Sequence, residues 1–296
     1  MTSPAWEFTN PDGTTYTCTF GDMAFSADGS TAVFGAPFYV PDATSNVSLV
    51  YIYAQTDHVW SQAPVAVLGN PRPGGNDNDC FGCGPIAISA DGSTLLLGDT
   101  GATIDGLSSA GAAYLYKRVD GTWDTTPVAT VLDPEMKALD QFAISVALSA
   151  DGNEVLIGDA NGYGTSGGPG AGYLYVAQPG GIWPTDPKPA VVLQAPDAQK
   201  FDYFGSEVAF AANGTDAFIE NDPIITGNEP PGSYPLPGVY LFQQVDGEWP
   251  VTPIRKFVLP KGYEDFGAIG PGFAVSGDGN TLMITALSPS LAKQGP

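Results

Sequence analysis

Basic residues are scarce in this chain of 296 residues. Lysine and arginine together number 10, against 32 aspartates and glutamates, so the formal net charge is −22. A field of that sign repels phosphate groups, which excludes nucleic acid as an expected partner. The chain also lacks an apolar run of about 18 residues, the length that a membrane-spanning helix needs, so we expect no membrane insertion.

Histidine and cysteine are also rare. The single histidine, His58, cannot form a multi-histidine metal site, and it lies in an outer hairpin, where it would not serve a serine-hydrolase triad. Three cysteines allow one internal disulfide at most, so the fold does not depend on a disulfide framework. Residues 1–6 have neither the basic region nor the apolar core of a signal peptide. We therefore expect a chain that either is not exported in this form or has lost its leader.

Glycine and proline, by contrast, are abundant at 38 and 27 residues. This composition excludes coiled coils and helical bundles, whereas an apolar content of 43% is enough to build a core. A repeat runs through the chain, and its most regular mark is an Asp-Gly or Asn-Gly turn at spacings of 63, 60, 62 and 65 residues. The turns are Asp28-Gly29, Asp91-Gly92, Asp151-Gly152, Asn213-Gly214 and Asp278-Gly279.

Each repeat contains four short strand signals. An alternating strand precedes the turn, an apolar strand follows it, and then come an aromatic strand such as Tyr114-Leu115-Tyr116 and, after a tryptophan, a last apolar strand. Four antiparallel strands in a unit of some 60 residues are typical of a propeller blade. A stacked solenoid is the alternative, although its repeats are usually shorter. We therefore predict one all-β domain over residues 1–296, a β-propeller of five blades.

The repeats resemble the FG-GAP family, the integrin alpha-like β-propellers, and most closely its bacterial secreted members. The first repeat has both halves of the family motif, Phe20-Gly21 and Gly35-Ala36-Pro37. Later repeats begin at Phe81, Phe142, Phe204 and Phe266, and their second half is degraded to Gly98-Asp99, Gly158-Asp159 and Asn221-Asp222-Pro223. The resemblance implies a propeller fold. The family's calcium loop, Asp-x-Asp-x-Asp-Gly, is not carried over, because the hairpin here has a single carboxylate.

Residues 5–9 have the spacing of a fourth strand, yet no third strand precedes them. The last repeat has signals only for strands at 273–275 and 281–285. We therefore expect the N-terminal strand to close the ring by completing the last blade, which would remove an exposed sheet edge. Two alternatives stay open, namely a longer propeller of which this is a part and a missing strand supplied by a neighbouring molecule.

Long loops join strands two and three, and strand four to the next blade, and both sets are expected at one end of the ring. Loops on a rigid scaffold commonly carry binding residues. The candidate ligand-binding residues there are Tyr39, Asp99, Asp105, Asp159, Tyr163, Asp222 and Tyr234.

An aspartate recurs just before the repeated phenylalanine. These carboxylates, with one more from an acidic cluster, are weak candidates for a calcium site near the channel mouth, the only cofactor that we consider. The candidates are Asp77, Asp79, Asp140, Asp202 and Asp265. The alternative is structural, since an aspartate in this place often caps a turn by accepting a backbone N–H.

We interpret the cysteines and the repeated tryptophans as structural residues. Cys18 and Cys80 enter neighbouring first strands at similar heights, so a bridge between them is a candidate, with buried free thiols as the alternative. A redox role for Cys80-x-x-Cys83 is disfavoured because the motif lies on a strand. Tryptophans 60, 123, 183 and 249 hold one place in the repeat, which indicates packing.

The function expected from these features is a non-catalytic extracellular binding or adhesion module that uses the long-loop face. Its partner would be a protein or glycan at a cell surface, and its acidic surface would keep it soluble outside the cell. A structural subunit that assembles head-to-tail by strand exchange is the alternative, and self-association follows from it. A hydrolase or lyase acting through loop carboxylates is the third hypothesis.

Overall fold

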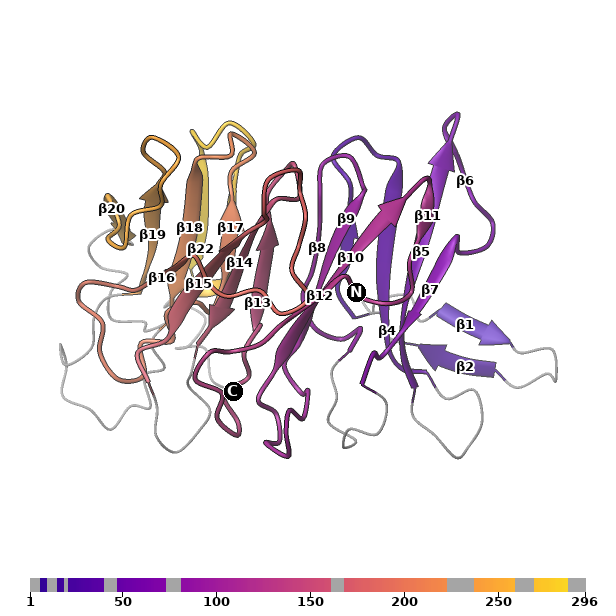
Figure 1. Ribbon diagram of the computed structural model, residues 1–296, viewed down its shortest axis with the longest axis horizontal. Helices are drawn as coiled ribbons and strands as arrows, with labels where there is room; N and C mark the ends of the chain where they lie inside the picture. The colour runs from indigo at the N-terminus through magenta and orange to yellow at the C-terminus, as the bar shows by residue number, and fades with distance from the viewer. Residues whose placement is uncertain are drawn as a thin grey trace, which may run out of the picture.

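The computed structural model describes residues 6–9, 15–18, 21–39, 47–72, 81–160, 168–222, 237–258 and 269–286. In these residues the regular elements are β-strands, and every strand pairing is antiparallel (Figure 1). The predicted all-β propeller architecture of antiparallel blades is therefore confirmed. The described part of the chain contains no helix that could cross a membrane.

Four sheets each take their strands from one sequence repeat, and we call them blades one to four. Blade one consists of β3 (Met23–Phe25), β4 (Thr31–Tyr39), β5 (Val47–Thr56), β6 (Val59–Trp60) and β7 (Ala66–Gly69). Blade two consists of β8 (Ile86–Ile88), β9 (Thr94–Asp99), β10 (Ala112–Val119), β11 (Thr122–Trp123) and β12 (Ala129–Val131). Blade three consists of β13 (Ser145–Leu148), β14 (Glu154–Asp159), β15 (Ala171–Val176) and β16 (Val191–Leu193). Blade four consists of β17 (Val208–Phe210), β18 (Asp216–Asn221), β19 (Gly238–Gln243) and β20 (Arg255–Val258).

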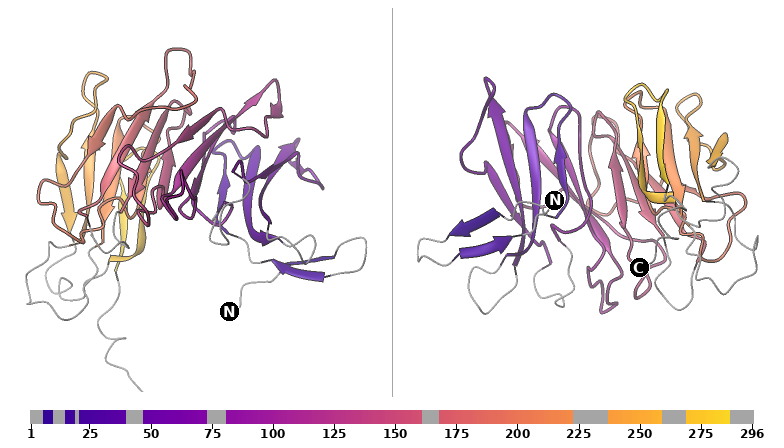
Figure 2. Two further views of the ribbon diagram at one scale, coloured as in Figure 1. Left: turned by 60° about the horizontal axis from the view of Figure 1, so that its bottom comes forward. Right: turned by 180° about the vertical axis from the view of Figure 1, so that it is seen from behind.

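The blades stand side by side in chain order along an arc (Figures 1 and 2). Neighbouring blades contact one another through their first strands, β3 with β8, β8 with β13, and β13 with β17. The Asp-Gly turns lie at one end of the strands, which we call the hairpin end. Because the strands alternate in direction, the connections from strand two to strand three, and from one blade to the next, lie at the opposite end, which we call the loop end.

One network of hydrogen bonds closes the Asp-Gly turns. In blade two, Ser89 Oγ donates to Asp91 Oδ1 over 2.7 Å, the N–H of Ser93 donates to the same oxygen over 3.0 Å, and the N–H of Thr94 donates to Ser89 Oγ over 2.9 Å. Gly92 has a φ of 64°, which glycine adopts without steric cost. The same bonds recur in blades one and three and in the fifth repeat.

Backbone hydrogen bonds connect adjacent blades at both ends. At the hairpin end the N–H of Asp28 donates to Ala90 O over 3.1 Å, and the N–H of Ala90 donates to Ala150 O over 2.9 Å. At the loop end, the backbone at the repeated phenylalanine pairs with the preceding blade. Phe142 forms a parallel bridge with Gly111. Phe204 bridges Gly170 in the same way.

Glycines in the second strands allow the blades to approach closely. A Cβ atom on Gly35, Gly98 or Gly158 would overlap the backbone carbonyl oxygen of Gly82, Ala143 or Gly205 in the next blade. The three positions are equivalent in the repeat. Gly98 and Gly158 belong to the degraded second half of the family motif. Glycine is present there because the next blade packs too closely for a side chain.

The core consists of apolar clusters between successive blades. The repeated phenylalanine packs edge-on against the aromatic third strand of its own repeat, in the pairs Phe81–Tyr114, Phe142–Tyr173 and Phe204–Tyr240 with centroid distances of 5.9, 5.7 and 5.3 Å. Two of the four repeated tryptophans pack as predicted: Trp123 and Trp183 are buried, and Trp183 Nε1 donates to Gly152 O over 3.2 Å, whereas Trp60 is exposed and Trp249 half-buried.

Closure of the ring by residues 5–9 is not found, and this prediction is wrong for the described residues. The N-terminal strand β1 (Trp6–Thr9) pairs instead with β2 (Thr15–Cys18). The fifth repeat forms a sheet of two described strands, β21 (Ile269–Val275) and β22 (Leu282–Ala286), at the other end of the arc (Figure 2). Residues 10–14 read Asn-Pro-Asp-Gly-Thr, a turn sequence, and pairing across so short a connection costs far less chain entropy than closing a ring. The number of five blades stays a prediction.

The close approach at the second-strand glycines can be tested by adding one methyl group. We expect Gly158→Ala to lower the free energy of unfolding by about 1–3 kcal/mol, because the carbonyl of Gly205 lies where the new Cβ must go. Gly69→Ala is the matched control, since no atom lies within 4 Å of its Cβ position. Urea denaturation measures both variants, and equal stability of the two would contradict the interpretation.

Candidate functional site

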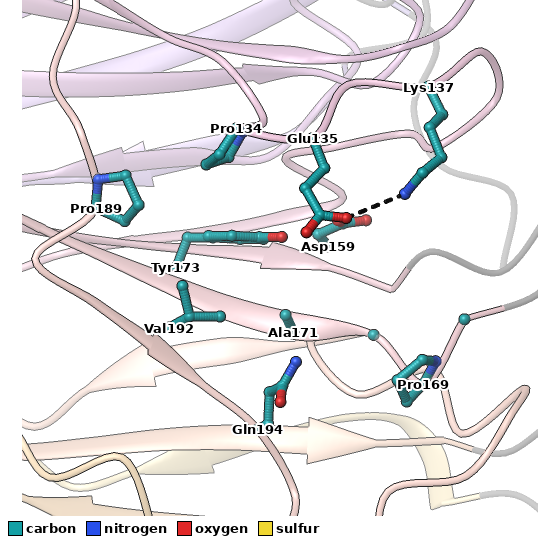
Figure 3. A pocket seen from close by; sticks show the side chains of 12 residues that line it. Pro134, Glu135, Lys137, Asp159, Pro169, Ala171, Tyr173, Pro189, Val192 and Gln194 are labelled. Carbon is teal, nitrogen blue, oxygen red and sulfur yellow. Dashed lines mark hydrogen bonds and ion pairs between the residues drawn. The ribbon is translucent and has the colours of Figure 1, made fainter.

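A pocket of about 410 Å³ opens at the loop end beside blade three (Figure 3). Its walls come from the connection between blades two and three, from the ends of β14 and β15, and from β16. The lining residues are Pro134, Glu135, Lys137, Asp159, Gly168, Pro169, Gly170, Ala171, Tyr173, Pro189, Val192 and Gln194.

Tyr173 presents its hydroxyl group to this pocket from the middle of β15. Its ring is buried and held edge-on against Phe142, and in Figure 3 its hydroxyl points towards the carboxylate of Glu135. Burial raises the pKa of Tyr173, and the negative charges of nearby carboxylates raise it further. The phenol is therefore neutral at physiological pH and can donate a hydrogen bond to a ligand.

Blade four shows why the corresponding place in blade three is open. There Tyr240 pairs in register with Lys256, whose Nζ lies 4.6 Å from the centre of the tyrosine ring and 3.0 Å from Asp197 Oδ2. The Tyr240 hydroxyl donates to Asp197 Oδ1 over 2.7 Å. In blade three the residue in register with Tyr173 is Val192, whose short side chain leaves space in front of the hydroxyl.

The pocket has one ion pair and a further carboxylate. Lys137 Nζ lies 3.4 Å from Glu135 Oε2, and both side chains are exposed to solvent (Figure 3). Asp159, at the end of β14, is only 1% exposed, although it lines the pocket. One lysine thus faces two carboxylates, so the pocket is acidic overall.

Two buried aspartates support the loop that carries Glu135 and Lys137. Asp133 Oδ1 accepts the N–H of Glu135 over 2.9 Å, and the carboxylate of Asp140 accepts the N–H of Lys137. Burial raises the pKa of both aspartates, and the charge of Asp140 adds to the rise at Asp133. The backbone conformation is unusual here, with φ values of 67° at Leu139 and 58° at Gln141. Phe201 and Tyr203, at the equivalent places of the next connection, have φ values of 66° and 52°, so this conformation belongs to the repeat and does not mark the pocket.

Of the predicted ligand-binding residues whose side chains the structure describes, only Asp159 lines the pocket. Asp99 is fully buried in blade two, Asp105 is exposed in a turn, and Asp222 is half-buried after β18. Tyr39 ends β4, but its side chain lies outside the described residues, as do Tyr163 and Tyr234 entirely. Sequence reasoning missed Glu135, Lys137 and Tyr173. Tyr173 was missed because an aromatic third strand recurs in each of the four blades, so its tyrosines were interpreted as packing residues only.

The metal candidates that the structure describes cap turns. Asp202 Oδ2 accepts the N–H of Gln199 over 2.6 Å, and Asp140 accepts a backbone N–H in the same place of the preceding connection. Across the described ranges, no group of three or more acidic, cysteine or histidine side chains is arranged to hold a metal ion. Asp77, Asp79 and Asp265 lie outside those ranges.

The disulfide prediction needs correction. Cys83 takes part in a disulfide, and three cysteines allow a single internal bridge, so a Cys18–Cys80 pair is excluded. Cys83 precedes β8 at the loop end, close to the glycine contact between blades one and two. The side chains of Cys18 and Cys80 lie outside the described residues.

A second carboxylate group lies between blade four and the fifth repeat. Glu220 occupies the second-strand position that is glycine in the first three blades, and Glu207 lies opposite it on the neighbouring strand. Glu207 Oε2 accepts the N–H of Phe273 on β21 over 3.1 Å. Burial, together with the charges of Glu207 and Asp222, raises the pKa of Glu220 to about 8. This interface is therefore built around a protonated carboxyl group instead of a close backbone contact.

Comparison with known proteins identifies the fold but no family. No family model matches the chain, and no curated protein matches it in sequence, so the relation to the FG-GAP family stays a prediction. A protein of Bacteroides uniformis provisionally assigned as a 6-phosphogluconolactonase matches with a TM-score of 0.52 and 14% identity, over 94% of this chain and 68% of that one. A similar protein of Bacteroides fragilis gives 0.51 and 14%, over 90% and 64%. Hydrazine synthase of Kuenenia stuttgartiensis gives 0.53 and 11%, over 93% and 56%. The chain thus spans less than two thirds of the last two proteins.

These matches correct the expected function. The sequence predicted a non-catalytic extracellular binding or adhesion module, with a strand-exchanging structural subunit as the alternative. The three structures compared above are instead assigned to enzymes, two of them provisionally to lactonases. The glycine and phenylalanine of the FG-GAP motif are explained here by blade packing, which carries no information about adhesion.

The raised pKa of Glu220 predicts that stability falls as the pH rises. The ordinary pKa of this carboxyl is 4.5, so between that pH and about 8 the folded chain holds a proton that the unfolded chain has released. Stability from this group is complete below pH 4.5 and is lost towards pH 8; Asp222, with a pKa of about 6, acts in the same direction. We expect the melting temperature to fall from about pH 5 to about pH 8.5, and Glu220→Gln to reduce that fall.

Glu248→Gln is the control for this experiment, because it makes the same substitution at an exposed position. Differential scanning calorimetry across the pH range measures all three proteins. If Glu220→Gln and Glu248→Gln follow the parent in parallel, the proton is not held at Glu220.

Proposed function

We propose that this chain is a hydrolase of small lactones and that its active site is the loop-end pocket of blade three. The observation that supports the proposal is the convergence of Glu135, Lys137, Asp159 and Tyr173 on one pocket. This revives the hypothesis of a hydrolase that acts through loop carboxylates. The two fold neighbours provisionally assigned as 6-phosphogluconolactonases make lactones the first substrates to test.

The groups in the pocket match what hydrolysis of a cyclic ester requires. A carboxylate takes a proton from the attacking water, and Glu135 is accessible for this role. The water oxygen bonds to the carbonyl carbon, and the ammonium group of Lys137 stabilises the oxyanion that forms. The ring C–O bond then breaks, the proton passes from Glu135 to the leaving ring oxygen, and the product is an open-chain hydroxy acid.

Tyr173 and Asp159 are assigned to substrate binding. The neutral Tyr173 hydroxyl can donate to a ring or carbonyl oxygen, and the Asp159 carboxylate can accept from sugar hydroxyl groups. Both come from strands of blade three, so their positions are fixed before a ligand binds, which lowers the entropic cost of binding.

The charge of the pocket favours a neutral sugar lactone over a phosphorylated one. A single lysine, already paired with Glu135, faces the carboxylates of Glu135 and Asp159 in a chain of net charge −22. A phosphate dianion would find no second cation among the lining residues. The proposed substrate class is therefore the uncharged aldonolactones.

The proposal is tested by following acid release from glucono-1,5-lactone in a pH-stat, with the spontaneous rate subtracted. We expect Lys137→Gln to lower kcat/KM about 100-fold, the usual effect of removing one oxyanion-stabilising donor. Lys188→Gln is the matched control, because Lys188 is exposed and paired with Asp186 in the same blade. The 6-phosphate of the same lactone, run in parallel, tests the preference for a neutral substrate.

Lack of acceleration over buffer would overturn the proposal and support the earlier expectation of a chain without enzyme activity. Equal activity of the two lysine variants would place the reaction elsewhere. The extracellular location, and a cell-surface protein or glycan as partner, stay predictions that this assay does not address.

A further inference from the structure

A second pocket, of about 190 Å³, lies among the first strands at the hairpin end, away from the loop-end pocket. It takes its walls from all four blades. The lining residues are Phe25, Ala27, Ile88, Ala90, Leu148, Ala150, Phe210, Ala211 and Ala212. None of them is charged, which is notable in so acidic a chain.

The pocket is a property of the repeat. Phe25, Ile88, Leu148 and Phe210 pair in register with Ala32, Leu95, Val155 and Ala217, the same place in each blade. The small residue two positions later, an alanine in every blade, keeps the space between these larger side chains open. Equivalent side chains of four blades therefore face one space, and no single loop creates it.

The walls are fixed by aromatic packing outside the pocket. Phe25 contacts Phe34 and Trp60 edge-on, with centroid distances of 6.0 and 6.4 Å, and Phe210 packs against Trp249 at 5.9 Å. Phe25 nevertheless remains 56% exposed, so a large apolar surface faces solvent here. The pocket is formed in advance and is open to a ligand.

The hairpin turns next to the pocket carry carboxylates. Asp28, Asp91 and Asp151 each directly follow a lining alanine, and Asp278 lies in the equivalent turn of the fifth repeat. Hydrogen bonds from neighbouring serines lower the pKa of Asp28 and Asp278 and, against the effect of burial, also that of Asp91 and Asp151. These carboxylates stay ionised at neutral pH. Arg118, whose Nη2 donates to Asp91 O over 3.4 Å, offsets part of the charge.

We propose that the hairpin-end pocket binds a basic peptide segment, which inserts one bulky apolar side chain among the first strands and pairs its lysines or arginines with the turn aspartates. Apolar cavities of about 150 Å³ hold a benzene ring, so this pocket has room for one aromatic or branched side chain. The carboxylates belong to separate blades, so a ligand needs several cations to reach them. The chain's charge also attracts such a ligand over long range.

The test uses the full chain and the peptide Lys-Lys-Phe-Lys-Lys, and binding is followed by calorimetry and by tryptophan fluorescence, to which Trp60 and Trp249 at the pocket walls contribute. Two matched peptides replace the phenylalanine with alanine or every lysine with glutamate. We expect the first peptide to bind about tenfold tighter than the alanine peptide and to weaken as salt rises from about 50 to about 500 mM, while the glutamate peptide does not bind.

Three variants of the protein locate the site. Ala27→Leu places a larger side chain in the pocket at an exposed position. Asp91→Asn with Asp151→Asn removes two charges but keeps the oxygen that accepts the turn hydrogen bonds. Asp120→Asn with Asp246→Asn removes the same charge from exposed outer hairpins and is the control.

We expect the first two variants to weaken binding about tenfold and the control to leave it within about twofold. Three outcomes would overturn the proposal: no binding of the phenylalanine peptide, equal binding of the alanine peptide, or equal weakening by the control. The last would mean attraction by net charge alone. Because the loop-end pocket plays no part here, a failed lactonase assay leaves this test unaffected.

Discussion

Contact between the backbones of successive blades is the constraint on which the rest of the structure depends. At Gly35, Gly98 and Gly158 the carbonyl group of the next blade occupies the place of a Cβ atom. This distance lets the hairpin turns and the loop-end residues bond across blades. It also brings the first strands together, so that their side chains enclose one apolar space. Where glycine is replaced, at Glu220, the interface changes its chemistry from close backbone packing to buried carboxyl groups.

The fold could be predicted from the sequence because the same information appears several times. The Asp-Gly turns, the aromatic third strand and the phenylalanine that packs against it recur in phase, and each has one local explanation. The pairing of β1 could not be inferred from spacing to Phe20, because a four-residue strand can pair with any open edge. The decisive signal was the turn sequence of residues 10–14, which makes a hairpin with β2 the least costly partner in chain entropy.

The candidate site was much less predictable, for a physical reason. Repetition identifies residues that have the same role in every blade, whereas the pocket also needs residues that belong to one connection only. The residue paired with the third-strand tyrosine is a valine or threonine in blades one to three and a lysine in blade four, so the space in front of the Tyr173 hydroxyl does not by itself distinguish blade three. Glu135 and Lys137 lie in a connection whose length varies, so no periodic argument reaches them. Asp159 was found because it begins a long loop between the second and third strands, where binding residues were expected.

The arc has a consequence for how the molecule opens. When each unit is stabilised by its neighbours, units inside the array have two interfaces and those at the ends have one, as in a linear chain of coupled elements. Blades two, three and four are inside, and blade three is the middle unit. Fluctuations should therefore begin at β21–β22 and at blade one and move inward, so backbone amides in β14 should exchange with solvent last. The pocket beside blade three belongs to the part of the chain that stays ordered longest, which suits a site whose groups must keep fixed positions.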